Sequence, residues 1–144
     1  MKFMWTDKTD STVYNQALSI RKEVFIKEQQ VPEELEIDEL ESQAEHVVLF
    51  AEDQPIGTAR ILEKEPALYK IQRVAILKPQ RGKGLGFALM QEAEHHIRRL
   101  GGSKMILDAQ LHAIPFYESL GFSPQGKEFL DAGIPHRRMT KTLA

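Results

Sequence analysis

Apolar and polar positions alternate along this chain with two periods, which predicts a mixed α/β (α+β) fold. Apolar residues recur at helical spacing over residues 13–28 and 85–100, and a shorter helix is predicted over 114–120. Runs rich in β-branched and aliphatic residues, bounded by turn signals, predict strands at 3–6, 46–52, 56–62, 67–77, 104–109, 122–129 and 134–142. The resulting order, β-α-β-β-β-α-β-α-β-β, predicts one domain over residues 1–144. We expect a mixed central sheet of six to seven strands, flanked by about three to four helices.

A glycine-rich segment separates the fourth predicted strand from the second helix. Its three glycines lie within five residues and are Gly82, Gly84 and Gly86. The first amides of a helix lack intrahelical partners and attract anions, and glycine lets a phosphate approach the backbone closely. No Ser, Thr, Asp or Asn occurs over residues 79–86 to cap those amides, and Arg81 and Lys83 add positive charge. The segment therefore predicts an anion site, although a plain helix-entry loop is the alternative on the glycines alone.

Spacing excludes two common phosphate-binding motifs in this segment. A P-loop needs a Gly five residues before its Gly-Lys pair and Ser or Thr after the Lys, but Leu77 and Gly84 occupy those positions. A dinucleotide fingerprint counted from Gly82 and Gly84 needs a third Gly where Phe87 stands. A generic nucleotide-binding α/β domain is therefore disfavoured.

Composition narrows the class of protein further. The chain has 42% hydrophobic and 28% charged residues, a net charge of −2 and no cysteine. These values are typical of a globular protein, and we expect no nucleic-acid partner held by bulk charge. The absence of cysteine removes disulfides and thiolate metal sites and fits a reducing, cytoplasmic location. The sequence contains no apolar run long enough for a signal peptide or a membrane span, so no membrane partner is expected.

An acidic segment occupies residues 28–45, where eight Asp or Glu residues occur and no Lys or Arg. A solvated acidic loop is one interpretation. An electrostatic funnel for a cationic acceptor is the other. Four apolar residues are interleaved with the acids, so part of the segment is expected to pack on the domain: Val31, Leu35, Ile37 and Leu40.

The sequence Arg81-Gly82-Lys83-Gly84-Leu85-Gly86 resembles the R-x-x-G-x-G loop of the GCN5-related N-acetyltransferase (GNAT) superfamily. The preceding Arg73-Val74-Ala75-Ile76 resembles its central strand, and residues 113–122, AIPFYESLGF, resemble its A-I-x-x-Y-E-x-x-G-F signature. Within the superfamily, residues 21–41 with GIPHRRM resemble the ElaA/YjcF-like branch of small bacterial enzymes. The resemblance covers nearly the whole chain.

This resemblance implies acetyl-CoA as cosubstrate and, as acceptor, a primary amine of a small molecule or of a protein, which attacks the thioester directly. Its implied coenzyme-binding residues are Val74, Ala75, Ile76, Arg81, Gly82, Lys83, Gly84, Leu85, Gly86, Phe87, Gln110, Phe116 and Tyr117. The loop would hold the pyrophosphate, and the strand backbone would pair with the pantetheine arm. Gln110 departs from the family pattern, because it stands where many relatives carry Asn.

Tyr117 is implied as the proton donor to the leaving thiolate, because it occupies the family's Tyr position and a phenol is protonated near neutral pH. Many relatives carry a Glu base near the start of the central strand, where this chain has Lys70 and Gln72. His136 is the preferred substitute base and Glu28 a second candidate, with Asp38, Glu39, His46 and His112 as further alternatives. Loss of the amine proton through water is also open.

Two side chains next to these segments, Arg21 and Arg73, are expected to be ion-paired supports. No catalytic metal is expected, because no H-E-x-x-H or comparable ligand spacing occurs. A non-catalytic acyl-CoA-binding or sensor module stays open as an alternative to the enzyme. A homodimer is a further expectation, since small proteins of this type often pair.

Overall fold

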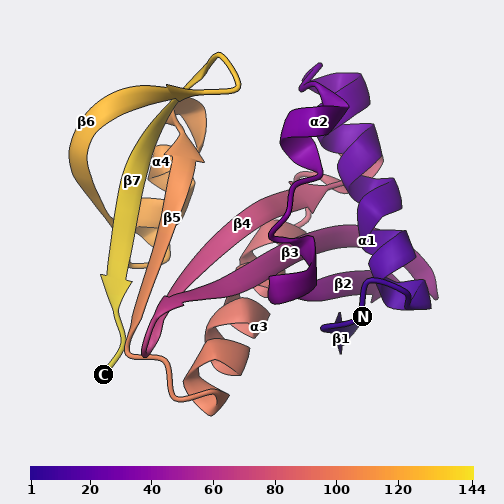
Figure 1. Ribbon diagram of the computed structural model, residues 1–144, viewed down its shortest axis with the longest axis horizontal. Coiled ribbons are helices and arrows are strands. Elements are labelled where there is room, and N and C mark those ends of the chain that lie inside the picture. The colour runs from indigo at the N-terminus through magenta and orange to yellow at the C-terminus, as the bar shows by residue number, and fades with distance from the viewer.

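The computed structural model describes residues 1–144 and contains one seven-stranded sheet with helices on both faces (Figure 1). The strands are β1 (Lys2–Thr6), β2 (Glu45–Ala51), β3 (Gln54–Glu65), β4 (Leu68–Ile76), β5 (Lys104–Gln110), β6 (Ser123–Asp131) and β7 (Ile134–Thr142). The α-helices are α1 (Thr12–Arg21), α2 (Glu33–Glu36), α3 (Leu85–Arg99) and α4 (Ile114–Ser119). The predicted order of elements and the predicted number of strands are confirmed, and α2 is an additional short helix within the acidic segment.

The sheet has the strand order β1-β2-β3-β4-β5-β7-β6. Strands β2 to β4 form an antiparallel meander, as the hairpin signals predict, and β1 pairs antiparallel with the outer edge of β2. The connection from β4 through α3 to β5 then makes the one parallel pair of the sheet, and the hairpin of β6 and β7 adds to the far edge of β5. The crossover through α3 is what a parallel pair requires, because it cannot be closed by a tight turn.

The first helix begins at a capping serine and changes its hydrogen-bonding pattern partway along. The Ser11 hydroxyl accepts a hydrogen bond from the Tyr14 amide at 3.1 Å, as expected for an N-cap. From Lys22–Glu28 the chain continues as a π-helix, in which the Gln29 amide donates to the Val24 carbonyl. The predicted extent of this helix is therefore right, but its last seven residues are not α-helical. Its apolar residues Ala17, Ile20 and Val24 pack on one face of the sheet, against Val48, Phe50 and Ala75.

The helix α3 covers the opposite face of the sheet and packs into the largest hydrophobic cluster. Its residues Leu89, Met90, Ala93 and Ile97 are buried, as the helical spacing predicts. The predicted inclusion of Leu100 in this buried stripe is wrong, because Leu100 lies past the last helical turn and is 44% exposed. Three 3₁₀ turns complete the chain, at Glu41–Gln43, Lys78–Gln80 and Leu111–Ala113. None of the helices combines the length and the hydropathy needed to cross a bilayer.

Candidate active site

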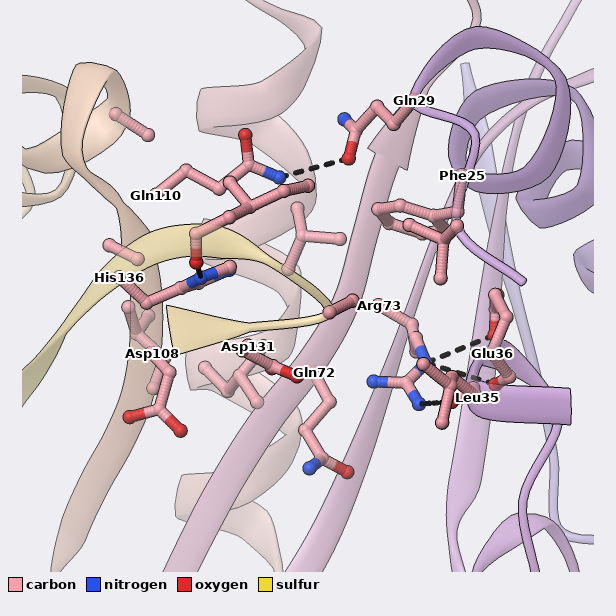
Figure 2. Close-up of a pocket in the computed structure, with 18 of the residues that line it drawn as sticks. Phe25, Gln29, Leu35, Glu36, Gln72, Arg73, Asp108, Gln110, Asp131 and His136 are labelled. Carbon is pink, nitrogen blue, oxygen red and sulfur yellow. Dashed lines mark hydrogen bonds and ion pairs between the residues drawn. The ribbon is translucent and has the colours of Figure 1, made fainter. Parts of the chain in front are cut away.

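The sheet opens where β4 and β5 diverge, and a cavity lies at this opening. The two strands are paired only over three residue pairs, from Leu68 with Lys104 to Lys70 with Ile106. Beyond that point they separate, as Figure 1 shows, so the edge of β4 that faces β5 has no strand partner. A cavity of about 260 Å³ occupies the opening and is lined from β4, β5, the β6–β7 hairpin and the end of the first helix (Figure 2). This volume is slightly below the usual range of about 300–1,000 Å³ for small-molecule sites.

A β-bulge in β4 lies in the wall of this cavity. Thr58 pairs with Ala75 and Arg60 pairs with Gln72, so the single residue Ala59 faces both Arg73 and Val74. Arg73 has φ +56°, a left-handed conformation that is costly for a residue with a side chain. Such bulges redirect side chains and backbone groups, and they are frequent beside active sites. The bulge precedes the segment of β4 that β5 leaves without a strand partner and whose backbone, Val74 to Ile76, the sequence resemblance assigns to the pantetheine arm.

The glycine-rich segment lies at the N-terminus of α3 and presents unpaired amides. The backbone N–H groups of residues 82–87 donate to no other group of the protein, and the N-cap position Gly84 makes no side-chain capping bond. Gly82 and Gly84 have φ +80° and +76°, and a Cβ atom at either position would have no neighbour within 4 Å. A turn of this shape with free amides and a helix N-terminus is an anion-binding arrangement.

The charged side chains beside these amides are partly engaged within the protein. Arg81 donates two hydrogen bonds to the Glu28 carboxylate, at 2.6 and 2.9 Å, and a third to the Ile76 carbonyl. Lys83 is exposed and donates to Gln80 at 3.2 Å. Leu85 packs on the core, whereas Phe87 is 44% exposed beside the loop. The positive charge of Arg81 is therefore shared with Glu28.

Tyr117 and Phe116 lie on α4, between the glycine loop and the cavity. Tyr117 lines the cavity, and its hydroxyl makes no hydrogen bond within the protein. Burial raises the pKa of Tyr117 to about 12, so the phenol keeps its proton at neutral pH. The Phe116 ring packs on the loop, with its Cζ atom 3.5 Å from the position a Cβ of Gly86 would occupy. The two aromatic rings meet edge to face, with centroids 5.0 Å apart.

A side-chain bridge crosses the upper part of the cavity. The Gln110 amide nitrogen, at the end of β5, donates to the Gln29 side-chain oxygen at 2.9 Å (Figure 2). The bridge joins the end of β5 to the segment after the π-helix, two parts of the chain that no backbone bond connects directly. Gln29 was not foreseen from the sequence, because nothing local indicates that its side chain reaches β5.

Two histidines line the cavity, and one of them has a defined tautomer. The His136 Nδ1 atom lies 2.6 Å from the Ile134 carbonyl oxygen, which can only accept, so Nδ1 carries a proton. In the neutral ring Nε2 then has the free lone pair. The ring also stacks on Phe129, with centroids 6.0 Å apart. His112 also lines the cavity.

The remaining base candidates lie outside the cavity. The hydrogen bonds from Arg81 lower the pKa of Glu28, and a carboxylate held in that pair is a weak base, so the structure does not support Glu28 in this role. His46, on β2, is only 1% exposed, and this burial lowers its pKa. Asp38 is bound to Arg60, and Glu39 is exposed and does not line the cavity. Of the predicted bases, only His136 and His112 line the cavity, and of these two only His136 has a ring nitrogen fixed by a hydrogen bond.

Part of the acidic segment forms a buried ion network rather than a solvated loop or a funnel. Arg21 is 1% exposed and binds Glu36 and Glu41 at 2.6–2.8 Å. The network is completed by Arg60, which binds Asp38 and Glu41, and by Arg73, which binds Glu36 and Asp38. Three guanidinium groups thus balance three carboxylates. The prediction that Arg21 and Arg73 are ion-paired supports is confirmed.

Comparisons with known proteins agree with this arrangement. The model of the acetyltransferase (GNAT) domain family matches residues 7–143. The uncharacterized N-acetyltransferase YjcF of Bacillus subtilis is 44% identical over 126 residues, which cover 87% of this chain and 89% of YjcF. A crystal structure of an acyl-CoA N-acyltransferase from Pseudomonas aeruginosa is 28% identical, covers 98% of this chain and 99% of that one, and has a TM-score of 0.87. The crystal structure of Escherichia coli ElaA is 25% identical, with coverage of 97% and 98% and a TM-score of 0.85. The chain therefore belongs to the GNAT family of acetyltransferases, within its ElaA/YjcF-like branch.

Proposed function

We propose that this acetyltransferase uses acetyl-CoA and transfers its acetyl group to a primary amine by direct attack. The observation that carries the proposal is the run of unpaired amides at residues 82–87, next to the open edge of β4. A diphosphate would accept from those amides and would be favoured by the dipole of α3 and by Lys83. The name of the Pseudomonas relative, an acyl-CoA N-acyltransferase, also supports a coenzyme A thioester as donor.

The backbone of β4 has a second task in this proposal. The pantetheine arm would pair with Val74, Ala75 and Ile76 along the edge that β5 leaves free. An amide at the bulge would donate to the thioester carbonyl oxygen as negative charge develops there. Such a donor contributes about 3 kcal/mol to transition-state stabilisation when it is aimed at the oxyanion.

The side chains of the cavity would handle the two protons of the reaction. The amine nitrogen forms a bond to the thioester carbon, and the carbon–sulfur bond breaks. His136 would take the proton that the amine loses, through its free Nε2. Tyr117 would donate its proton to the thiolate and would regain one from solvent. Gln110 would bond the pantetheine arm after the Gln29 bridge opens.

A pair of glycine variants tests the coenzyme site. Gly84→Glu places a carboxylate among the free amides, and its Cβ meets no neighbour within 4 Å, so its cost to folding is the strain of a side chain at φ +76°, about 1–2 kcal/mol. Gly126→Glu is the matched control, because Gly126 also has a left-handed φ, +74°, and open space around it, but it lies on β6. By calorimetric titration of coenzyme A, we expect Gly84→Glu to lose at least about 100-fold in affinity and Gly126→Glu to keep it. Equal affinity in folded Gly84→Glu would remove the proposed site.

Thiol release from acetyl-CoA across a panel of amines separates the enzyme from a non-catalytic acyl-CoA-binding module. We expect at least one amine to release thiol. Binding of acetyl-CoA without thiol release on any amine would favour the binding module instead. The homodimer stays a prediction, and light scattering of the purified chain measures it.

A further inference from the structure

The bulge in β4 directs two neighbouring polar side chains to the same side of the sheet. In a regular strand, residues 72 and 73 would point to opposite faces. Here Gln72 accepts a hydrogen bond from Arg60 at 3.0 Å, and Arg73 donates to Glu36 at 3.0 Å. Arg60 and Glu36 both belong to the ion network on the α1–α2 face, so the two side chains share that face. Both also line the cavity.

Each of these side chains has a donor that the protein leaves unpaired. Arg73 uses its Nε and Nη2 atoms to bind Glu36, Asp38 and the Leu35 carbonyl, but its Nη1 atom makes no hydrogen bond. Figure 2 shows this nitrogen turned away from Glu36 and Leu35, toward the open part of the cavity. The Gln72 oxygen must face Arg60, because a guanidinium can only donate. Its NH₂ group therefore remains free.

The charges around these two donors favour an anion over a second cation. The carboxylates of Glu36, Asp38 and Glu41 are each bound by guanidinium groups, so the network carries no excess negative charge. On the β5 side, Asp108 is bound by both Lys70 at 3.0 Å and Arg138 at 2.6 Å. There, two cations face one carboxylate. In the cavity lining only Asp131, at the tip of the β6–β7 hairpin, is an acid without a cationic partner.

A free guanidinium N–H and a free amide NH₂ on adjacent residues of the cavity wall are together complementary to a carboxylate, which can accept from both. The donors lie in the strand segment that would hold the thioester, and the cavity of about 260 Å³ has room only for a small molecule beside it. We propose that the acceptor is a small amine that also carries a carboxylate, and that Arg73 and Gln72 bind the carboxylate while the amine faces His136. This inference rests on the proposed acetyl transfer.

Matched pairs of acceptors test the carboxylate site. The probes are the protein amino acids, β-alanine, 4-aminobutyrate and 5-aminopentanoate, each compared with its primary amide in thiol release from acetyl-CoA. A hydrogen bond to a charged group is worth a factor of about 10 to 100, so the best carboxylate is expected to exceed its amide by at least about tenfold in kcat/KM. Amides that match or exceed their carboxylates would overturn the inference.

Two variants assign the preference to the named residues. Gln72→Leu removes one donor and leaves the ion pairs of Arg73 in place, and Arg73→Gln removes the other. Both are expected to lower the ratio of carboxylate to amide, and Arg73→Gln lowers it more because it removes the charged donor. Lys64→Gln, at an exposed position near the end of β3, is the control and should keep the wild-type ratio. An unchanged ratio in both folded variants would also overturn the inference.

A binding measurement separates failure of this inference from failure of acetyl transfer. The side-chain amide signal of Gln72 is followed by ¹⁵N NMR in the protein saturated with coenzyme A, while 4-aminobutyrate or its amide is added, followed by the other probe pairs. We expect a shift with carboxylates and none with amides. If no amine releases thiol, the proposed reaction fails, and this titration still decides the carboxylate site. No shift with any carboxylate would overturn it.

Discussion

Replacing Arg21 by methionine is expected to destabilise the protein strongly, because it leaves two buried carboxylates short of their main partner. The guanidinium makes five hydrogen bonds to Glu36 and Glu41 and is 1% exposed. Methionine fills much of the same volume, so the change removes charge and hydrogen bonds more than packing. The perturbation therefore measures how much the network depends on this one cation.

The expected loss of folding stability depends on which ion pairs Glu36 and Glu41 keep after the substitution. Breaking a buried ion pair by removing one partner typically costs about 3–5 kcal/mol. Glu36 would keep Arg73 at 3.0 Å and Glu41 would keep Arg60 at 2.7 Å, so neither carboxylate becomes wholly unpaired. We therefore expect a loss at the lower end, about 3 kcal/mol, which is a large part of the roughly 5–15 kcal/mol that stabilises a typical domain.

Urea unfolding followed by circular dichroism measures this loss. With an m-value of about 2 kcal/mol/M, the midpoint should fall by about 1.5 M. Arg138→Met is the matched control, because Arg138 is 40% exposed and its partner Asp108 keeps Lys70. A partly exposed pair contributes about 1 kcal/mol or less. If Arg21→Met lowered stability no more than Arg138→Met, the network would not be the stabilising element inferred from its burial.

Three further predictions concern the bulge, the ion network and the cavity. Arg73→Gly should be about 0.5–1 kcal/mol more stable than Arg73→Ala in urea unfolding, because glycine accepts the φ of +56° without strain. This is the reverse of the usual order of the two residues in strands. A more stable alanine variant would contradict the strain inferred at the bulge. Although burial opposes it, hydrogen bonding to Arg60 lowers the pKa of Asp38 to about 2, below its value of about 3.9 in an unfolded chain, so its stabilisation is present above about pH 4 and is lost as the pH falls toward 2. Unfolding at pH 5 and pH 3 should therefore show a larger loss in wild type than in Asp38→Asn, and equal losses would count against the pair. Tyr117→Phe should lower the turnover of acetyl-CoA by about 100-fold or more while coenzyme affinity stays within about twofold, because only the transferable proton is removed; unchanged turnover would leave Tyr117 a packing residue.

The parts of the fold that could be predicted are those with local signals. The glycine cluster at residues 82–86 and the apolar spacing of α3 each depend on residues close in sequence, and the structure has both where they were expected. The same holds for Tyr117, which its surrounding motif placed on a short helix after β5. For such elements the sequence period and the turn residues are themselves the physical cause of the structure.

The parts that could not be predicted depend on contacts between distant residues. Glu36 and Glu41 are neutralised by arginines that lie 15 to 37 positions away, so a count of charges in the segment could not distinguish a buried network from a solvated loop. The bulge at Arg73 has no local signal either. A left-handed conformation is usually predicted where the sequence has glycine or asparagine, and this position has arginine. Its conformation is held by the hydrogen bonds that its own side chain makes to the 35–38 segment.

The short pairing between β4 and β5 has a mechanical consequence. Only three residue pairs join β4 to β5, beside two backbone hydrogen bonds from Ser103 and Lys104 to the Ala67 carbonyl. The rest of the cohesion between the two halves comes from side chains of the shared core, including Ile71, Ile97 and Leu107. A ligand lying between the two strands would bridge both halves, much as an added strand would. Saturation with coenzyme A should therefore raise the melting temperature and slow amide exchange in β5 and β7 more than in β2 and β3. In this protein, occupancy of the site and rigidity of the sheet would rise together.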